Sequence, residues 1–460
     1  MKDKILEHCP ELINETVANI QKLVRINSAR DEAHKEANKP FGPGVDQAFD
    51  TFLEMARALN MRTFKDPDGV YAYAELGPED GQLFGILGHL DVVPGLDPNL
   101  WTLGQPFSAD IVDNKIVGRG SLDDKGPVVI SMMAIKGLLD LGYEFKSRIR
   151  IIVGGAEETT WECIDKYKAE QEIPVVSFSP DAQFPLIFAE KGLLQFDGYA
   201  NNSYDFEVEA DGAYNAVCGK ATYRGDKAND VAAELDKLGF AYETNSDGSI
   251  SVIGKSTHAK DCNLGTNAVL RLAIAMYNVG IHAQSIDFLA EKIKETSFAE
   301  GLFDELQQDE VSGNLTLNIA GLIIKDGKET IKFDSRIPVL VDEKVVGETY
   351  VDALRSYGLT YEQVDYLHKL YVAQDSLLVT TLMDAYQTIT GDMESKPLSN
   401  GGATYSRAWE NCVAFGMVFE KQGMIDKMHQ PDEVLEIKFI EPALQIYSLA
   451  IYNLDQIDFR

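Results

Sequence analysis

The stretch LFGILGHLD, residues 83–91, decides the fold because it predicts a buried strand that ends on a histidine and an aspartate. Residues 83–88 form a continuous apolar run of the kind found in strands covered on both faces. His89 and Asp91 follow it, and side chains two residues apart on a strand point the same way while Leu90 packs behind. An H-x-D pair alone is a weak signal, but its place at this strand end favours a functional site.

Two more predicted strands also end on acids. RIRIIVGG (148–155) leads to Glu157 and Glu158, and PVVSFSPD (174–181) ends at Asp181. The carboxyl ends of strands form the rim of an open α/β sheet where ligands bind. Adjacent side chains on a strand point opposite ways, so one glutamate could bind a metal while the other handles a proton. Two solvated loop acids are the alternative interpretation.

The glycine-punctuated segment GRGSLDDKG (118–126) adds Asp123 and Asp124. Asp123 could bridge two cations while Asp124 supports the ligands from outside. The alternative is a helix N-cap, because Pro127 and an apolar helical pattern follow. Imidazole beside several carboxylates suits Zn²⁺ or Mn²⁺, and one tetrahedral ion needs fewer groups than this chain offers. The pattern predicts a two-metal hydrolytic site.

The order of patterns along the chain predicts an α/β fold with an insertion. Strands alternate with helices up to about residue 188, which is typical of a mostly parallel sheet covered by helices. Period-2 strands dominate 189–376, which predicts an inserted α+β domain long enough for two similar halves. A helical pattern returns from 377. We therefore expect a catalytic domain made of 1–188 and 377–460, interrupted by the insertion.

Composition narrows the function classes. The 460 residues carry a formal net charge of −31, which argues against nucleic acid or an anionic membrane as partner. The five cysteines are isolated, which predicts free thiols in a reducing compartment. We see no secretory apolar core and no apolar stretch long enough to span a bilayer, and expect a soluble, cytoplasmic protein. Phosphate-loop and G-x-S-x-G motifs are also absent from the sequence.

Three further segments are ambiguous from their residues alone. His258 in GKSTHAK follows a predicted strand, but a plain polar turn histidine is an equal alternative. His429 in KMHQPDE is uninformative by itself. The backbone of SNGGATY (399–405) could cradle a carboxylate or oxyanion, or form an ordinary turn.

Six segments taken together resemble one known family. GHLDVVPG, GRGSLDDKG, GGAEE, SPDAQFP, GGATYSRA and KMHQPDE match, in order, the signatures of the aminoacylase and carboxypeptidase-like two-metal peptidases, peptidase family M20. In length and detail the chain is most similar to the dipeptidase V (PepV-type) branch. The resemblance covers nearly the whole chain, and the ordered set is far more specific than any one motif.

The resemblance implies a role for each candidate around the metals. It implies two divalent ions per chain, Zn²⁺ first, with Mn²⁺ or Co²⁺ as alternatives. It also implies a cis peptide between Asp123 and Asp124. The implied roles are His89 and Asp181 on one ion, Glu158 and His429 on the other, Asp123 bridging both, Glu157 as general base and acid, and Asp91 orienting His89.

The resemblance also implies that the insertion is a lid. Asn215, His258 and Arg336 would reach the substrate, and Gly401 and Gly402 would line the pocket for its C-terminal part. Simpler relatives have a lid of about half this size and borrow a histidine and an asparagine from a partner subunit. A doubled lid would supply both within one chain, so we expect a monomer, with a homodimer as alternative.

The sequence departs from the family pattern at Cys218 and Glu410, where relatives commonly have proline. Neither position is an expected metal ligand, so the departures bear on substrate detail. The predicted function is a metal-dependent dipeptidase acting on small peptides. An N-acyl amino acid amidohydrolase is the alternative enzyme. A non-catalytic binding protein is the alternative from another class, and the intact Glu157 argues against it.

Overall fold

The computed structural model describes all residues from 1 to 460, which form two compact units. Unit 1 consists of Met1–Phe188, Tyr371–Leu398 and Thr404–Arg460, and unit 2 of Ala189–Leu370 with Ser399–Ala403. The sequence-based domain bounds of 1–188, 189–376 and 377–460 stay a prediction.

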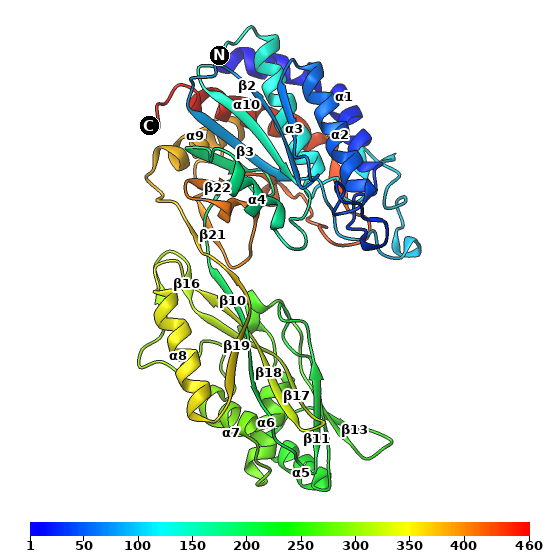
Figure 1. Cartoon of the computed structure of the whole chain (residues 1–460), viewed down its shortest axis with the longest axis vertical. Coiled ribbons are helices and arrows are strands. Elements are labelled where there is room, and N and C mark those ends of the chain that lie inside the picture. The colour runs from blue at the N-terminus through cyan, green and yellow to red at the C-terminus, as the bar shows by residue number, and fades with distance from the viewer. The chain divides into compact units, whose positions relative to one another are not determined.

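Unit 1 is built on a nine-stranded sheet whose centre is parallel (Figure 1). The strand order is β1-β2-β6-β3-β7-β22-β9-β20, with β21 paired to β9. β3 pairs in parallel with β6 and β7, and β22 is parallel to β7, whereas β1, β2 and β6 pair antiparallel. The strands are β1 Arg62–Lys65, β2 Tyr71–Leu76, β3 Leu83–His89, β6 Arg148–Gly154, β7 Val176–Ser179, β9 Ile187–Glu190, β20 Leu370–Tyr371, β21 Leu398–Asn400 and β22 Cys412–Ala414.

Every residue of β3 is buried, as its unbroken apolar sequence predicts for a strand covered on both faces. The predicted α/β class is confirmed. The sheet is mixed rather than uniformly parallel, because β1, β2 and β6 pair antiparallel at one end and β22 pairs antiparallel with β9 at the other.

Helices cover this sheet. α3 (Lys125–Asp140) is buried on nearly all sides because it contacts α1 (Lys2–Val24), α10 (Ile440–Leu454) and β3 (Figure 1). α9 (Leu377–Thr390) packs on α10, α2 (Pro43–Ala58) contacts β1 and β2, and α4 (Glu162–Glu170) contacts β2. The first and last helices of the chain therefore pack on the same central helix.

A three-stranded sheet brings the C-terminal segment beside the GRGSLDDKG segment. β24 (Val434–Glu436) pairs with β5 (Lys115–Val117), which pairs with β4 (Ile111–Val112). The β4–β5 hairpin turns at Asp113 and Asn114, both with positive φ as a type I′ turn requires.

Unit 2 is an α+β fold on an eight-stranded sheet, and all its strand pairs are antiparallel. The strand order is β13-β14-β12-β11-β17-β18-β10-β19. The strands are β10 Gly192–Ala200, β11 Glu207–Asp211, β12 Lys220–Arg224, β13 Tyr242–Thr244, β14 Ile250–Ile253, β17 Thr316–Lys325, β18 Lys328–Ile337 and β19 Thr360–Leu367.

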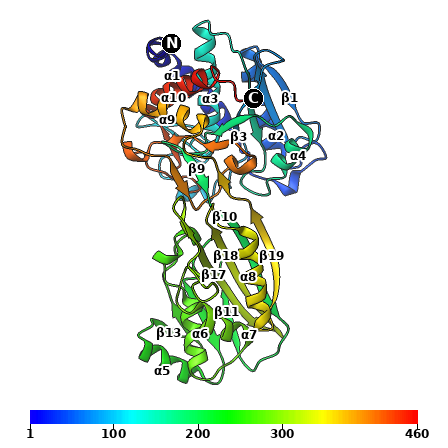
Figure 2. The ribbon, with the colours of Figure 1, turned by 90° about the vertical axis from the view of Figure 1, so that its left-hand side faces the viewer.

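Four helices cover the apolar side chains of this sheet. α6 (Ala268–Asn278) contacts β12 and β14, and α5 (Ala228–Leu238) packs on α6 and β14. α7 (Gln284–Phe288) contacts β10 and β18, and α8 (Glu343–Ser356) lies beside β19 (Figure 2). Each half thus has four strands and two helices and meets the other at β11 and β17. The similarity of the two halves stays a prediction.

All five cysteines are free and buried, as predicted. None of the helices combines the length and apolar character needed to cross a membrane. The cytoplasmic location stays a prediction.

Candidate metal centre

Three neighbouring parallel strands carry the predicted acids and histidine to one edge of the sheet. β6, β3 and β7 lie side by side and point the same way. Their ends deliver Glu157 and Glu158, His89 and Asp91, and Asp181 respectively. The sequence prediction that these groups meet is therefore supported by strand order alone.

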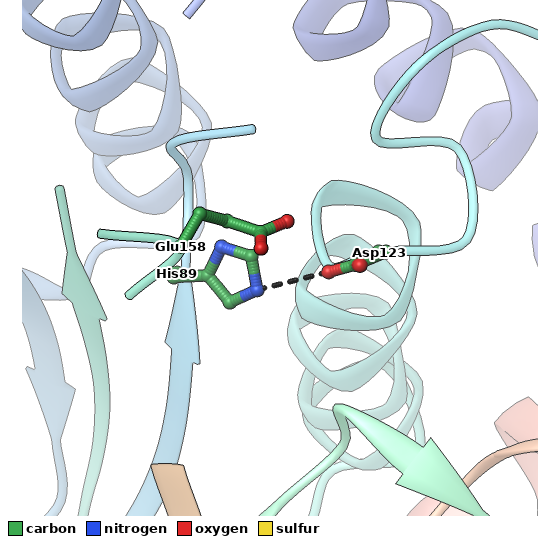
Figure 3. Close-up of side chains that lie close together, drawn as sticks. All are labelled: His89, Asp123 and Glu158. Atoms are coloured by element: carbon green, nitrogen blue, oxygen red, sulfur yellow. Dashed lines mark ion pairs between the residues drawn. The ribbon is translucent and has the colours of Figure 1, made fainter. Parts of the chain in front are cut away.

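Asp123 lies between two histidines. Its Oδ1 is 3.0 Å from His89 Nε2, and its Oδ2 is 3.0 Å from His429 Nε2. Figure 3 shows the carboxylate of Asp123 facing the imidazole of His89, with the Glu158 side chain above the ring in this view. A carboxylate whose two oxygens face different imidazoles has the arrangement of a bridging ligand.

The remaining groups fall on the two sides of this bridge. Asp181 Oδ2 lies 3.5 Å from His89 Nε2, and Glu157 Oε2 lies 4.0 Å from it. On the other side, Glu158 Oε2 lies 3.1 Å from His429 Nε2. Two atoms that bind one tetrahedral Zn²⁺ at about 2.0–2.1 Å lie roughly 3.4 Å apart. The separations within each group suit ligands of a shared ion.

Unpaired buried atoms support the same interpretation. His89 Nε2 and Glu158 Oε1 are buried and have no hydrogen-bond partner. His89 Nδ1 lies 3.0 Å from the Asp91 carbonyl oxygen, so Nδ1 carries the proton and Nε2 presents a lone pair to carboxylate oxygens. Acceptors that face acceptors in a buried site need a cation between them. The residues therefore fit a pair of divalent metals.

The electrostatics of the cluster also call for positive charge. Burial raises the pKa of Glu157 well above its ordinary value, and Asp181, Glu158 and Asp123 add to the rise although His89 opposes it. Burial likewise raises the pKa of Glu158 to about 7. Asp123 and Glu158 raise the pKa of His429 to about 11. These three shifts move the groups toward binding a proton, which is the response of a crowded anionic site, whereas the two histidines lower the pKa of Asp123 against the effect of burial.

Asp91 does more than the predicted orientation of His89. Its carboxylate accepts hydrogen bonds from the backbone N–H groups of Glu157 and Glu158, both at 3.1 Å, and lies 3.5 Å from His89 Nδ1. Asp91 therefore contacts the histidine ring through its backbone carbonyl and binds the glutamate pair through its side chain.

The alternative role of Asp124 as a helix cap is wrong. Asp124 occupies the N-cap position of α3 but makes no side-chain cap hydrogen bond. Its Oδ2 instead accepts a hydrogen bond of 3.2 Å from the backbone N–H of His89. The Asp123–Asp124 peptide is cis, as the resemblance implied.

Sequence reasoning missed Glu433 and Arg119, a buried ion pair behind Asp123. Glu433 Oε2 lies 2.6 Å from Arg119 Nη1. Glu433 Oε1 accepts hydrogen bonds from the backbone N–H groups of Leu122 (2.9 Å) and Asp123 (3.2 Å). Both residues stand within quoted motifs, but only the pairing of β24 with β5 reveals that they meet.

The remaining candidates lie in unit 2. His258 and Ala216 form an antiparallel bridge, which places Asn215 beside His258, and Ala259 N–H donates to the Asn215 carbonyl (2.8 Å). Arg336, in β18, is held by the buried carboxylate of Asp334 through Nε (2.6 Å) and Nη2 (2.9 Å). Arg336 Nη1 donates to the carbonyl of Gly401 (3.0 Å). Gly402, next to it, donates its N–H to Asn400 Oδ1 (3.1 Å).

His258 has the form of a neutral hydrogen-bond donor. Burial lowers its pKa below the ordinary value, and the charges of Arg336 and Lys260 lower it further. Its Nδ1 accepts a hydrogen bond from the backbone N–H of Lys260 (3.1 Å), so the proton of the neutral ring is on Nε2. The Nε2–H group can donate to a developing negative charge.

The chain matches one family model over most of its length. Residues 85–453 match the model described as peptidase family M20/M25/M40. A provisionally named dipeptidase of Staphylococcus haemolyticus is 33% identical over 477 residues, covering 98% of this chain and 99% of that protein.

The solved structures show the same fold at low identity. Human carnosine dipeptidase 1 aligns with a TM-score of 0.57 at 15% identity and covers 99% of this chain and 100% of its own. A di-peptidase of Saccharomyces cerevisiae aligns with a TM-score of 0.58 at 14% identity, covering 99% of both chains.

Replacing Glu433 tests whether it supports the metal centre. Glu433→Ala leaves Arg119 and two backbone N–H groups unpaired, so we expect unfolding free energy to fall by about 3–5 kcal/mol and metal affinity to fall with it. Glu433→Gln keeps an oxygen for the two N–H groups and should lose less of both. Urea unfolding of the metal-free protein and titration with Zn²⁺ measure the two effects. Equal metal affinity in wild type and Glu433→Ala would contradict the supporting role.

Proposed function

Since this chain belongs to peptidase family M20/M25/M40, we propose that this hydrolase is a dipeptidase whose site holds two divalent ions. We expect Zn²⁺ as the native metal, with Mn²⁺ or Co²⁺ as alternatives. The main observation behind this proposal is the position of Asp123. One of its carboxylate oxygens lies 3.0 Å from His89 Nε2, and the other lies 3.0 Å from His429 Nε2. In this proposal His89 and Asp181 would hold one ion, Glu158 and His429 would hold the other, and Asp123 would be shared between them. Bound there, the ions would supply Lewis-acid polarisation of the scissile carbonyl and a more acidic water.

Glu157 is proposed as the group that moves the proton. It takes a proton from the attacking water on a carboxylate oxygen and delivers it to the nitrogen of the leaving amine. Its position supports this role, because its Oε2 lies 4.0 Å from His89 Nε2, beside the groups that would hold the ions. Asp91 keeps Glu157 in place through the backbone N–H of that residue.

Unit 2 is proposed as the lid that binds the substrate. The neutral His258 donates Nε2–H to the oxyanion that forms on the scissile carbonyl oxygen. Arg336 offers a guanidinium already fixed by Asp334, and Asn215 offers an amide beside His258. Gly401 and Gly402 line the pocket for the C-terminal part of a short peptide.

A substrate panel tests the proposed reaction. Protein reconstituted with Zn²⁺, Mn²⁺ or Co²⁺ is assayed against dipeptides, tripeptides and N-acyl amino acids. We expect dipeptides to give the highest kcat/KM and tripeptides to be poor substrates, because a lid that encloses a short substrate leaves no room for a longer one. Faster cleavage of N-acyl amino acids would favour an amidohydrolase on the same metals.

The glutamate pair separates proton transfer from metal binding. Glu157→Ala should keep two bound metals per chain and lower kcat by at least about 10²-fold, the scale of general acid–base catalysis. Glu158→Ala should lose one metal, since its carboxylate lies beside His429. Elemental analysis after dialysis gives the stoichiometry, and steady-state assays give kcat. Normal turnover by Glu157→Ala would show that another group moves the proton.

Complementation tests whether one chain carries a whole active site. His258→Ala should lower kcat by about 10²–10³-fold, as for a lost oxyanion donor, with both metals retained. A mixture of inactive His258→Ala and Glu157→Ala chains should then recover nothing, and wild-type activity per chain should not vary with concentration. Recovery of activity in the mixture would mean that a partner subunit supplies the histidine.

A further inference from the structure

Asn318 connects the Asn215 segment to the middle of the sheet in unit 2. It lies in β17, is 1% exposed, and its Nδ2 donates to the carbonyl oxygens of Tyr214 (3.1 Å) and Ala216 (2.9 Å). Both partners are acceptors, so only the NH₂ end of the amide can face them. These two carbonyls flank Asn215, and the single side chain therefore holds that residue from both sides.

The Asn215 segment is in turn bonded to the His258 segment. Ala259 N–H donates to the Asn215 carbonyl (2.8 Å), and Val217 N–H donates to the Thr257 carbonyl (2.9 Å). Ala216 pairs with His258 between these two bonds. Any shift of the Asn215 backbone is thus passed directly to the backbone of His258.

The strand register places Asn318 beside the group that holds Arg336. β17 and β18 pair antiparallel with Asn318 opposite Asp334, and Asp334 binds the Arg336 guanidinium through two hydrogen bonds. Asn318 and Asp334 therefore occupy one rigid pair of strands. Asp334 sets the position of Arg336, and Asn318 sets the position of the Asn215 and His258 segments.

We propose that Asn318 is a positioning residue that fixes Asn215 and His258 relative to Arg336. The inference rests on the proposed function, in which these three residues contact the substrate. Asn318 itself is buried and acts only through the two carbonyls. Misplacing a group by about 1 Å can cost 10²-fold in rate, so loss of this bond pair should be visible in catalysis.

Hydrogen exchange tests the structural half of the inference without any substrate. Asn318→Leu removes both donors at similar size, and Asn318→Asp places a carboxylate against the two carbonyls. Asn202→Leu is the matched control, because Asn202 in unit 2 also donates two hydrogen bonds from its amide, to Gln284 and Glu329 (both 3.0 Å). We expect faster exchange at the Val217 and Ala259 amides in both Asn318 variants and unchanged exchange there in Asn202→Leu. Unchanged protection in the Asn318 variants would overturn the inference.

Kinetics test the catalytic half. Asn318→Leu should lower kcat on a dipeptide by about 10–10²-fold with both metals retained, while Asn202→Leu should stay near wild type. Because Asn318 acts through both Asn215 and His258, adding Asn318→Leu to the double variant Asn215→Ala/His258→Ala should lower kcat no further. A further loss of kcat in that triple variant, or full activity in Asn318→Leu, would overturn the positioning role. If the wild-type chain cleaves no dipeptide, the proposed function fails, and the exchange experiment still decides whether Asn318 holds the two segments together.

Discussion

The carboxylate of Asp123 touches both histidines of the metal centre, because each of its oxygens lies 3.0 Å from a different imidazole nitrogen. The other carboxylates arrange themselves on the two sides of this contact. Buried carboxylates at such spacing repel one another, and burying unpaired charge is costly. The site therefore needs either bound cations or bound protons to offset this repulsion. The raised pKa values of Glu157, Glu158 and His429 show the tendency of the metal-free site to take up protons.

Three further acids hold the backbone of the proposed ligands in place. Asp91 binds the N–H groups of the glutamate pair, and Asp124 binds the N–H of His89. Glu433 binds the N–H of Asp123 itself. In each case an acid close in sequence to a proposed ligand fixes the backbone of a different ligand. Three of the motifs thus each contain a proposed ligand and also an acid that holds the backbone of another motif.

Sequence predicted the strand-end residues well because a local rule places them. An apolar run marks a buried strand, strand order brings parallel ends together, and His89, Glu157 and Asp181 need nothing more to meet. Glu433 and Asn318 follow no such rule. Glu433 meets Asp123 only through the pairing of β24 with β5, and Asn318 meets Tyr214 only across the sheet of unit 2. Contacts between residues more than 100 positions apart depend on how the strands and helices pack in three dimensions. The spacing of apolar residues along the sequence does not predict that packing.

Two-metal activation of water is common to peptidases and deacylases, so unit 1 alone does not choose a substrate. Choice requires groups that distinguish a peptide with a free carboxylate from other amides. Unit 2 offers such groups in a prearranged form, since Arg336 is fixed by Asp334 and His258 is neutral with its proton on Nε2. Prearrangement matters because freely rotating side chains would lose part of the binding free energy to ordering. Under the proposed function the two units have separate tasks: the acids and histidines of unit 1 would hold the metals, and the fixed donors of unit 2 would select the substrate.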